Sequence, residues 1–321
     1  MLKKWMAKLG VGAATVDLRL DRPAYRLGET ITGAIRIEGG SVEQRISELS
    51  VLLMMKVYVQ GQEVTRPVQT YPVSRNFTVQ PKPFVQEIPF AFELPAGLAV
   101  STPSVQYYLH TKLDVERALD PTDLDAVQVL PPEPVERVLN ALARLDLRQK
   151  PDSGKLTPYG QEFSFFMGRP LGIPLKELEV IFFSMPGELR LLTELDLAVP
   201  GMFGGEMERK AEIVVPQDLL AAGREEELSR FLLDTLRTYA ENPQAIPYVS
   251  MASYGQPLHG HQGHYGHRGH GMGGMIGGMA AGFLGGMLLG EVMSEIGESA
   301  EDLFEEAGGG LDFDVDGFDE L

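Results

Sequence analysis

Apolar and polar residues alternate along several segments of the first 130 residues, and this period of two is typical of half-buried β-strands. The clearest case is 105–115, where Val105, Tyr107 and Leu109 share one face. Segment 49–59 carries apolar side chains on both faces, which indicates a strand that is covered on both sides. The predicted strands are 14–20, 31–37, 49–59, 77–79, 84–94 and 105–115. Glycine and proline turns separate them, so we expect a β-sandwich over 13–130.

A helical period follows in 131–147, which predicts a connecting helix. Its apolar stripe consists of Val135, Val138, Leu139, Leu142 and Leu145. A second strand set is strongest at 178–182 and 189–197, and a closing helix follows over 228–239. These elements predict a second β-sandwich over 148–250. The expected fold class is mainly β, with two tandem sandwich domains, a short N-terminal helix, a connecting helix and a low-complexity C-terminal tail.

The first twelve residues (1–12) combine basic charge with an apolar stripe. Leu2, Trp5, Met6 and Leu9 recur at helical spacing, with Lys3, Lys4 and Lys8 between them. Two interpretations of this amphipathic helix remain open: it packs against the body of the protein, or Trp5 and the lysines contact a membrane surface. The segment lacks the apolar core of a secretory signal.

Charge is unevenly distributed along the 321 residues. The formal net charge is −17, and residues 291–321 contain 12 acidic residues and no basic one, which leaves −5 for the first 290 residues. A body charge of −5 says little about partners, so the prediction of no nucleic-acid partner rests on the absence of a binding motif or an extended basic patch. The chain has no cysteine, which excludes disulfides and thiolate chemistry and fits a reducing compartment.

Several short motifs occur in a specific order in the first domain. They are Tyr25-Arg-Leu-Gly28-Glu29 with Gly33, Ile37-Glu-Gly39-Gly40, Val42-Glu-Gln44, Phe90-Ala-Phe92-Glu-Leu94-Pro95 and Ala118-Leu-Asp120-Pro121. With the Lys-Lys-Trp helix, the chain resembles the bacterial sporulation-control proteins, an arrestin-like family. The resemblance covers roughly residues 1–245 and is strongest in the first 125.

The resemblance implies two tandem β-sandwiches and a regulatory, protein-binding role without catalysis, associated with sporulation and cell division. One departure concerns the second domain. Where the family would have Asp-Arg-Arg followed by Gly-Leu, this chain has Asp196-Leu-Ala-Val-Pro200-Gly201. A partner surface built on that arginine pair is therefore not transferred to this chain.

Catalytic motifs are sparse. No Gly-Lys-Ser/Thr, Gly-x-Ser-x-Gly or His-Glu-x-x-His sequence occurs. Glu177 and Glu179 alternate on a predicted strand, where we interpret them as a solvated face. The sequence therefore predicts no catalytic or cofactor-binding residues, and a protein that is not an enzyme.

A histidine-rich, glycine-rich linker occupies 251–270. Its histidines are His259, His261, His264, His267 and His270. Imidazoles at this spacing on one chain can gather Zn²⁺ or Ni²⁺. The alternatives are a hydrophilic spacer and a pH sensor, because histidines gain charge near pH 6.

The next segment, 271–290, carries no charge and has glycine at every fourth position: Gly274, Gly278, Gly282, Gly286 and Gly290. Small residues at this spacing leave a groove along a helix in which a second helix can pack closely. Self-association or a partner helix is one hypothesis. Membrane insertion is another, since the length suffices for a span, and a low-complexity segment is the third.

The acidic tail, 291–321, ends in alternating acidic and apolar residues. Leu311, Phe313, Val315 and Phe318 are candidate anchors of a motif that docks on a basic partner; a merely solubilising tail is the alternative. The run Asp312-x-Asp314-x-Asp316-Gly317 resembles the start of an EF-hand loop, but the glutamate required at its position 12 would fall beyond Leu321.

Together these observations predict a cytoplasmic, non-enzymatic, arrestin-like adaptor that binds protein partners, with self-association as a homo-oligomer or peripheral membrane contact through the tail or N-terminal helix. Two alternatives remain: a Zn- or Ni-binding protein that uses its histidine tract, and a membrane-tethered envelope-stress component that uses 271–290.

Overall fold

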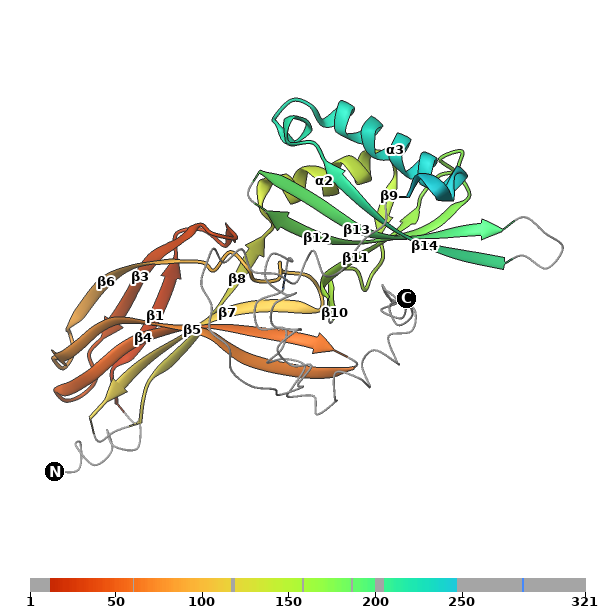
Figure 1. Cartoon of the computed structure of the whole chain (residues 1–321). Helices are drawn as coiled ribbons and strands as arrows, with labels where there is room; N and C mark the ends of the chain where they lie inside the picture. Colours follow the sequence, from red (N-terminus) through yellow and green to blue (C-terminus); the bar gives the residue numbers. More distant parts are fainter. Residues whose placement is uncertain are drawn as a thin grey trace, which may run out of the picture. The chain divides into compact units, whose positions relative to one another are not determined.

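The structure is a computed structural model that describes residues 12–59, 61–116, 119–157, 159–185, 187–199, 205–246 and 285. The chain divides into two compact units. The first combines Met1–Ala96 with Ser104–Leu130, and the second combines Gly97–Pro103 with Pro131–Leu321. Each unit has its own sheets and its own core (Figure 1).

The first unit is a β-sandwich. Its strands are β1 (Thr15–Leu20), β2 (Ala24–Arg26), β3 (Thr30–Glu38), β4 (Gln44–Val59), β5 (Gln62–Val79), β6 (Val85–Glu93), β7 (Val105–Val115) and β8 (Thr122–Leu130). One sheet has the order β1-β3-β6 and the other β2-β8-β7-β4-β5. All neighbours pair antiparallel except β2 and β8. Alternate residues of β3, β4 and β7, such as Ile35, Leu53 and Leu109, are fully buried.

The Tyr25 motif fixes the connection between β1 and β3. The buried Tyr25 hydroxyl donates a hydrogen bond to the Thr32 carbonyl (2.9 Å) and accepts one from the Arg22 amide (3.2 Å). The Arg22 guanidinium lies 4.5 Å from the centre of the Tyr25 ring and pairs with Glu29 (3.2 Å). Gly28 supplies the turn with φ of +79°, a conformation that side chains rarely adopt. The motif therefore has a structural role.

Strand β5 is much longer than the segment 77–79 that the sequence indicated. Most of its side chains are exposed or half-buried, because β5 is the end strand of its sheet. Its register against β4 shifts between Leu49 and Ser50 and between Leu53 and Met54, where Pro72 and Pro67 are the facing residues. Proline cannot donate to the ladder and is tolerated at such edge irregularities.

The second unit contains one sheet in its described part. Its elements are α2 (Glu133–Arg144), β9 (Leu147–Gln149), β10 (Lys155–Thr157), β11 (Gly160–Met167), β12 (Leu175–Met185), β13 (Glu188–Val199), β14 (Gly205–Val215), the 3₁₀ turn η1 (Gln217–Leu220), α3 (Glu225–Glu241) and the 3₁₀ turn η2 (Pro243–Ala245). The strand order is β10-β11-β12-β13-β14, and β9 pairs with β11 beside β10.

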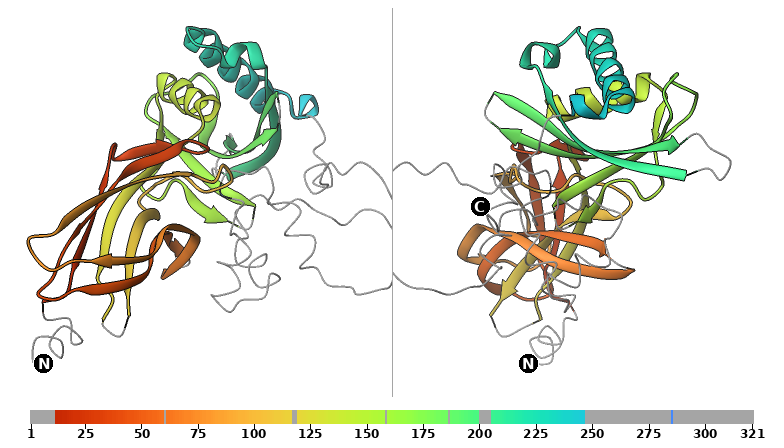
Figure 2. Two further views of the ribbon diagram at one scale, coloured as in Figure 1. Left: turned by 90° about the vertical axis from the view of Figure 1, so that its left-hand side faces the viewer. Right: turned by 45° about the vertical axis from the view of Figure 1, so that its right-hand side comes forward.

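Two helices cover one face of this sheet (Figures 1 and 2). Ser229 of α3 donates a hydrogen bond to the Ala141 carbonyl of α2 (3.2 Å). Tyr239 of α3 donates one to the Glu212 carbonyl of β14 (3.0 Å). The expected mainly β class with several sheets, consistent with an arrestin-like fold, is confirmed. In the described part of the second unit, however, α2 and α3 form the layer that we expected to be a second sheet, because their apolar stripes bury the sheet face.

Gln161 attaches 97–103 to the second unit. Its side chain is completely buried and accepts a hydrogen bond from the Val100 amide (2.7 Å). The same side chain donates to the carbonyls of Val100 (3.0 Å) and Gly154 (2.8 Å). Without Gln161 the buried amide and carbonyl of Val100 would lack partners, whereas the Gly154 carbonyl also accepts a hydrogen bond from the Thr102 hydroxyl (3.2 Å).

Replacing Gln161→Leu keeps similar volume but leaves the buried amide and the buried carbonyl of Val100 unpaired. We expect a loss of about 2–4 kcal/mol in the free energy of unfolding of the second unit. Calorimetry or denaturant titration followed by circular dichroism measures this loss. Gln149→Leu, at an exposed position on β9, is the matched control and should change little; equal effects of the two substitutions would contradict the assigned role.

Candidate functional site

The sheet face opposite the helices carries a row of carboxylates. Successive side chains of a strand point to opposite faces, so Glu177 and Glu179 of β12 share this face with Glu194 and Asp196 of β13 and Glu208 of β14. The register confirms this, because Glu179 pairs with Glu194, Glu177 pairs with Asp196, and Asp196 pairs with Glu208. We call these five residues the carboxylate face.

The centre of the carboxylate face is withdrawn from water. Glu194 is 3% exposed, and its Oε2 atom has no hydrogen-bond partner. Burial raises the pKa of Glu194 to about 8, and the neighbouring carboxylates add to the shift, while Lys210 on the adjacent strand opposes it. Burial also raises the pKa of Glu179 to about 7, and Glu162 adds to that shift. The pKa values of both side chains therefore lie above those of surface glutamates.

Lysines and a serine border the same face. Lys155 pairs with the buried Glu162 (3.0 Å), and Lys150 forms an ion pair with Glu177. Ser164 donates a hydrogen bond to Glu179 (3.3 Å). The prediction that Glu177 and Glu179 form a solvated face is therefore wrong, because both are half-buried among neighbours from adjacent strands.

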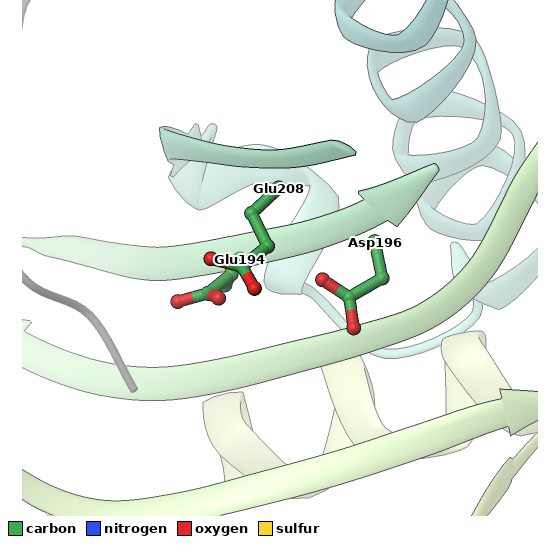
Figure 3. Close-up of side chains that lie close together, drawn as sticks. All are labelled: Glu194, Asp196 and Glu208. Carbon is green, nitrogen blue, oxygen red and sulfur yellow. The ribbon is translucent and has the colours of Figure 1, made fainter. Parts of the chain in front are cut away.

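Three members of the carboxylate face converge. One carboxylate oxygen from each of Glu194, Asp196 and Glu208 lies within 4.8 Å of the other two (Figure 3). Glu194 is buried, Asp196 is half-buried and Glu208 is exposed. Because exposure increases from Glu194 to Glu208, the three carboxylates are accessible to solvent from the Glu208 side. Oxygen ligands of this kind suit hard divalent cations.

The first unit has an aromatic groove of about 280 Å³ between β5 and β6. Its lining consists of Tyr71, Pro72, Val73, Pro89, Phe90, Ala91 and Phe92. The rings of Tyr71 and Phe92 stack with centroids 3.9 Å apart and an interplanar angle of 15°. The Tyr71 hydroxyl donates to the Glu93 carbonyl (3.1 Å), which holds the stack in place. Both strands are the last of their sheets.

A second group of carboxylates lies on β1 and β8. Asp123 accepts a hydrogen bond from the Leu18 amide (2.8 Å), and Asp125 shares its face of β8. Burial raises the pKa of Asp125 to about 6, and Asp123 and Asp17 add to the shift. The Oδ2 atom of Asp125 is buried without a hydrogen-bond partner.

Most residues that the sequence singled out lie outside the described part of the chain. This applies to Trp5 with Lys3, Lys4 and Lys8, to the five histidines from His259 to His270, to the five glycines from Gly274 to Gly290, and to the anchors Leu311, Phe313, Val315 and Phe318. These assignments stay predictions. None of the described helices is long and apolar enough to cross a bilayer.

Gly285 is the one described residue of 271–290. It is buried in a turn with φ of +80°, and its amide donates to the Leu98 carbonyl (3.3 Å). A Cβ atom at this position would lie 3.0 Å from Leu156 and 3.1 Å from Gln161. A right-handed helix has negative φ, so the backbone of Gly285 itself is not α-helical.

Sequence reasoning missed the convergence of Glu194, Asp196 and Glu208. A signal was present, because Glu177/Glu179, Glu194/Asp196 and Glu206/Glu208 occur at alternate positions of three successive segments. Antiparallel pairing of those segments would have aligned the pairs. Leu197 and Ala198 stand where the resemblance led us to expect an arginine pair, and both are apolar. Leu197 is buried on the helix side, and Ala198 shares the face of Asp196.

Comparison with known proteins agrees with this architecture. The family model described as SpoOM protein (Spo0M) matches residues 2–199. The sporulation-control protein spo0M of Bacillus subtilis (strain 168) is 30% identical over 262 residues, which cover 74% of this chain and 98% of that protein. The crystal structure of Spo0M from Bacillus subtilis aligns with a TM-score of 0.56 and 26% identity, over 72% of this chain and all of that one.

The fold and these comparisons define a mainly β protein of arrestin-like architecture. The chain belongs to the Spo0M family of sporulation-control proteins. The resemblance drawn from the Tyr25 and Gly39-Gly40 motifs is thereby confirmed.

Replacing Asp125→Asn tests the electrostatics of β8. In the folded protein Asp125 keeps its proton up to about pH 6, whereas in the unfolded chain it ionises near pH 4. The stability that this proton contributes is present below pH 4 and is lost as the pH rises from 4 to 6. The variant should therefore gain about 1 kcal/mol over the wild type at pH 7, discounted for partial exposure, and little at pH 4.

Urea denaturation at pH 4 and pH 7 measures the difference. Glu87→Gln, an exposed carboxylate of β6, controls for the removal of one negative charge. A gain for Asp125→Asn that is the same at both pH values would count against this assignment.

Proposed function

We propose that this protein is a non-catalytic regulatory adaptor that acts by binding protein partners. The observation that carries the proposal is the alignment with the sporulation-control protein spo0M over 98% of the length of that protein at 30% identity. An alignment that spans the relative from end to end supports a shared regulatory role rather than one shared module. Sporulation and cell division are the processes with which the family resemblance associates that role.

The aromatic groove between β5 and β6 is the surface that we assign to the partner. End strands of sheets leave one row of peptide groups unpaired, and an extended segment of another protein can add to that row. The half-buried Tyr71 ring, which stacks on the buried Phe92, supplies apolar contact area at small entropic cost, since aromatic side chains have few rotatable bonds. The proposed occupant is an extended apolar segment of a protein partner.

The acidic tail supplies a second contact in this proposal. Leu311, Phe313, Val315 and Phe318 would anchor it, and the surrounding carboxylates would steer it toward a basic surface. A chain ending at residue 290 keeps the groove and lacks these anchors. Comparing it with the full chain separates the two contributions.

Expression of the chain in Bacillus subtilis lacking its own Spo0M tests the regulatory role. We expect the sporulation frequency to move toward that of the parent strain, because the two proteins align along nearly all of the relative. Spore counts after heat treatment measure this. If the protein is expressed at the level of the native Spo0M and the sporulation frequency does not change, a shared role is contradicted.

Crosslinking tests the groove. The chain has no cysteine, so a single introduced thiol is a unique attachment point for a photocrosslinker. Ala91→Cys places it on the exposed rim of the groove, and Ala126→Cys places it at an exposed site on β8 as the matched control. We expect Ala91→Cys to give a discrete adduct in cells of the source organism, at least fivefold stronger than that of Ala126→Cys. Equal amounts of adduct from both sites, or no adduct from Ala91→Cys, would contradict the assignment of the groove to the partner.

A further inference from the structure

The antiparallel register of β13 and β14 brings three carboxylates together. Asp196 lies directly opposite Glu208, and Glu194 precedes Asp196 by two residues, so all three share one face. Their nearest oxygens lie within 4.8 Å of one another (Figure 3). These residues come from two strands held by eleven paired positions, so their spacing is built into the sheet.

This arrangement is electrostatically unfavourable by itself. Like charges directly opposite each other destabilise a strand pair. Lys210 faces Glu194 from β14, and Glu179 faces it from β12. Lys155 also acts on Glu179, so two lysines oppose the four carboxylates when all of them are ionised. The negative charges outnumber the positive ones, which favours a bound cation.

Glu194 supplies a second observation, which does not depend on the proximity of the other two residues. Its side chain is 97% buried, and Oε2 makes no hydrogen bond. A buried carboxylate oxygen without a partner is costly, and native proteins usually satisfy such atoms with a donor or a bound ion. This oxygen belongs to the carboxylate that converges with Asp196 and Glu208. It points to a ligand that supplies positive charge.

We propose that Glu194, Asp196 and Glu208 bind a hard divalent cation of the Ca²⁺ class. Carboxylate oxygens are the ligands such cations prefer, and Ca²⁺ tolerates irregular geometry and completes its shell with water. The exposed Glu208 is the entry side, and the buried Glu194 is the inner ligand. The cation offsets the repulsion across β13 and β14 and gives the unpaired oxygen of Glu194 a partner.

Calorimetric titration of Ca²⁺ into the full-length, chelator-treated protein tests the site. We expect saturable binding with a Kd of about 10⁻⁵–10⁻³ M. Glu194→Gln and Glu208→Gln should each weaken it at least tenfold. Glu226→Gln, an exposed carboxylate on α3 of the same unit, is the matched control and should bind as the wild type does.

Thermal unfolding gives an independent measure. Millimolar Ca²⁺ should raise the Tm of the wild type and of Glu226→Gln by several degrees, and that of Glu208→Gln by much less. Glu208 is exposed, so its substitution leaves the fold intact even where Glu194→Gln does not. Unchanged affinity in Glu208→Gln would assign any binding to another part of the chain, such as the acidic tail, and overturn the proposal. Failure of the wild type to bind at 10 mM would do the same.

Discussion

The register between β13 and β14 is the constraint on which the second unit depends. Leu195 and Leu197 are buried on the side of the sheet covered by α2 and α3, and strand alternation then places Glu194 and Asp196 on the opposite side. A slip by one residue would move Leu189, Leu191, Leu195 and Leu197 off the helix-covered side of the sheet. Hydrophobic burial therefore fixes the position of the carboxylates, at the cost of holding like charges together.

In the first unit the important feature is the pair of end strands that terminate its two sheets. Its end strands β5 and β6 carry prolines and the Tyr71–Phe92 stack, and each pairs with a neighbour on one side only. Gly33 in the neighbouring β3 allows close packing, since a Cβ atom there would lie 2.2 Å from the Arg19 carbonyl. That Cβ atom would also lie 2.9 Å from the ring of Phe90, so Gly33 leaves room for a side chain that lines the groove. The two units offer chemically distinct surfaces, one aromatic and one acidic.

Periodicity predicted the elements that have one buried face. Strand β7 and helices α2 and α3 were found because their apolar residues recur at the period of their own backbone. Most of β5 was missed, because an end strand with two prolines buries few side chains and shows no alternation. The packing of these helices on the sheet, where we expected a second sheet, was not predicted. Periodicity identifies the type of each element but does not show which element covers which.

The carboxylate face shows the same limit. The alternation of Glu177 and Glu179 along one strand indicates surface residues. Their partial burial results from neighbours on strands β11 and β13, which the local sequence does not reveal. The convergence of Asp196 with Glu208 likewise requires the hairpin register.

A long-wavelength anomalous diffraction measurement on crystals grown with Ca²⁺ tests the proposed cation site most directly. The proposal predicts an anomalous peak about 2.3–2.6 Å from oxygens of Glu194, Asp196 and Glu208. The same arrangement of three carboxylates without an anomalous peak between them would contradict the proposal.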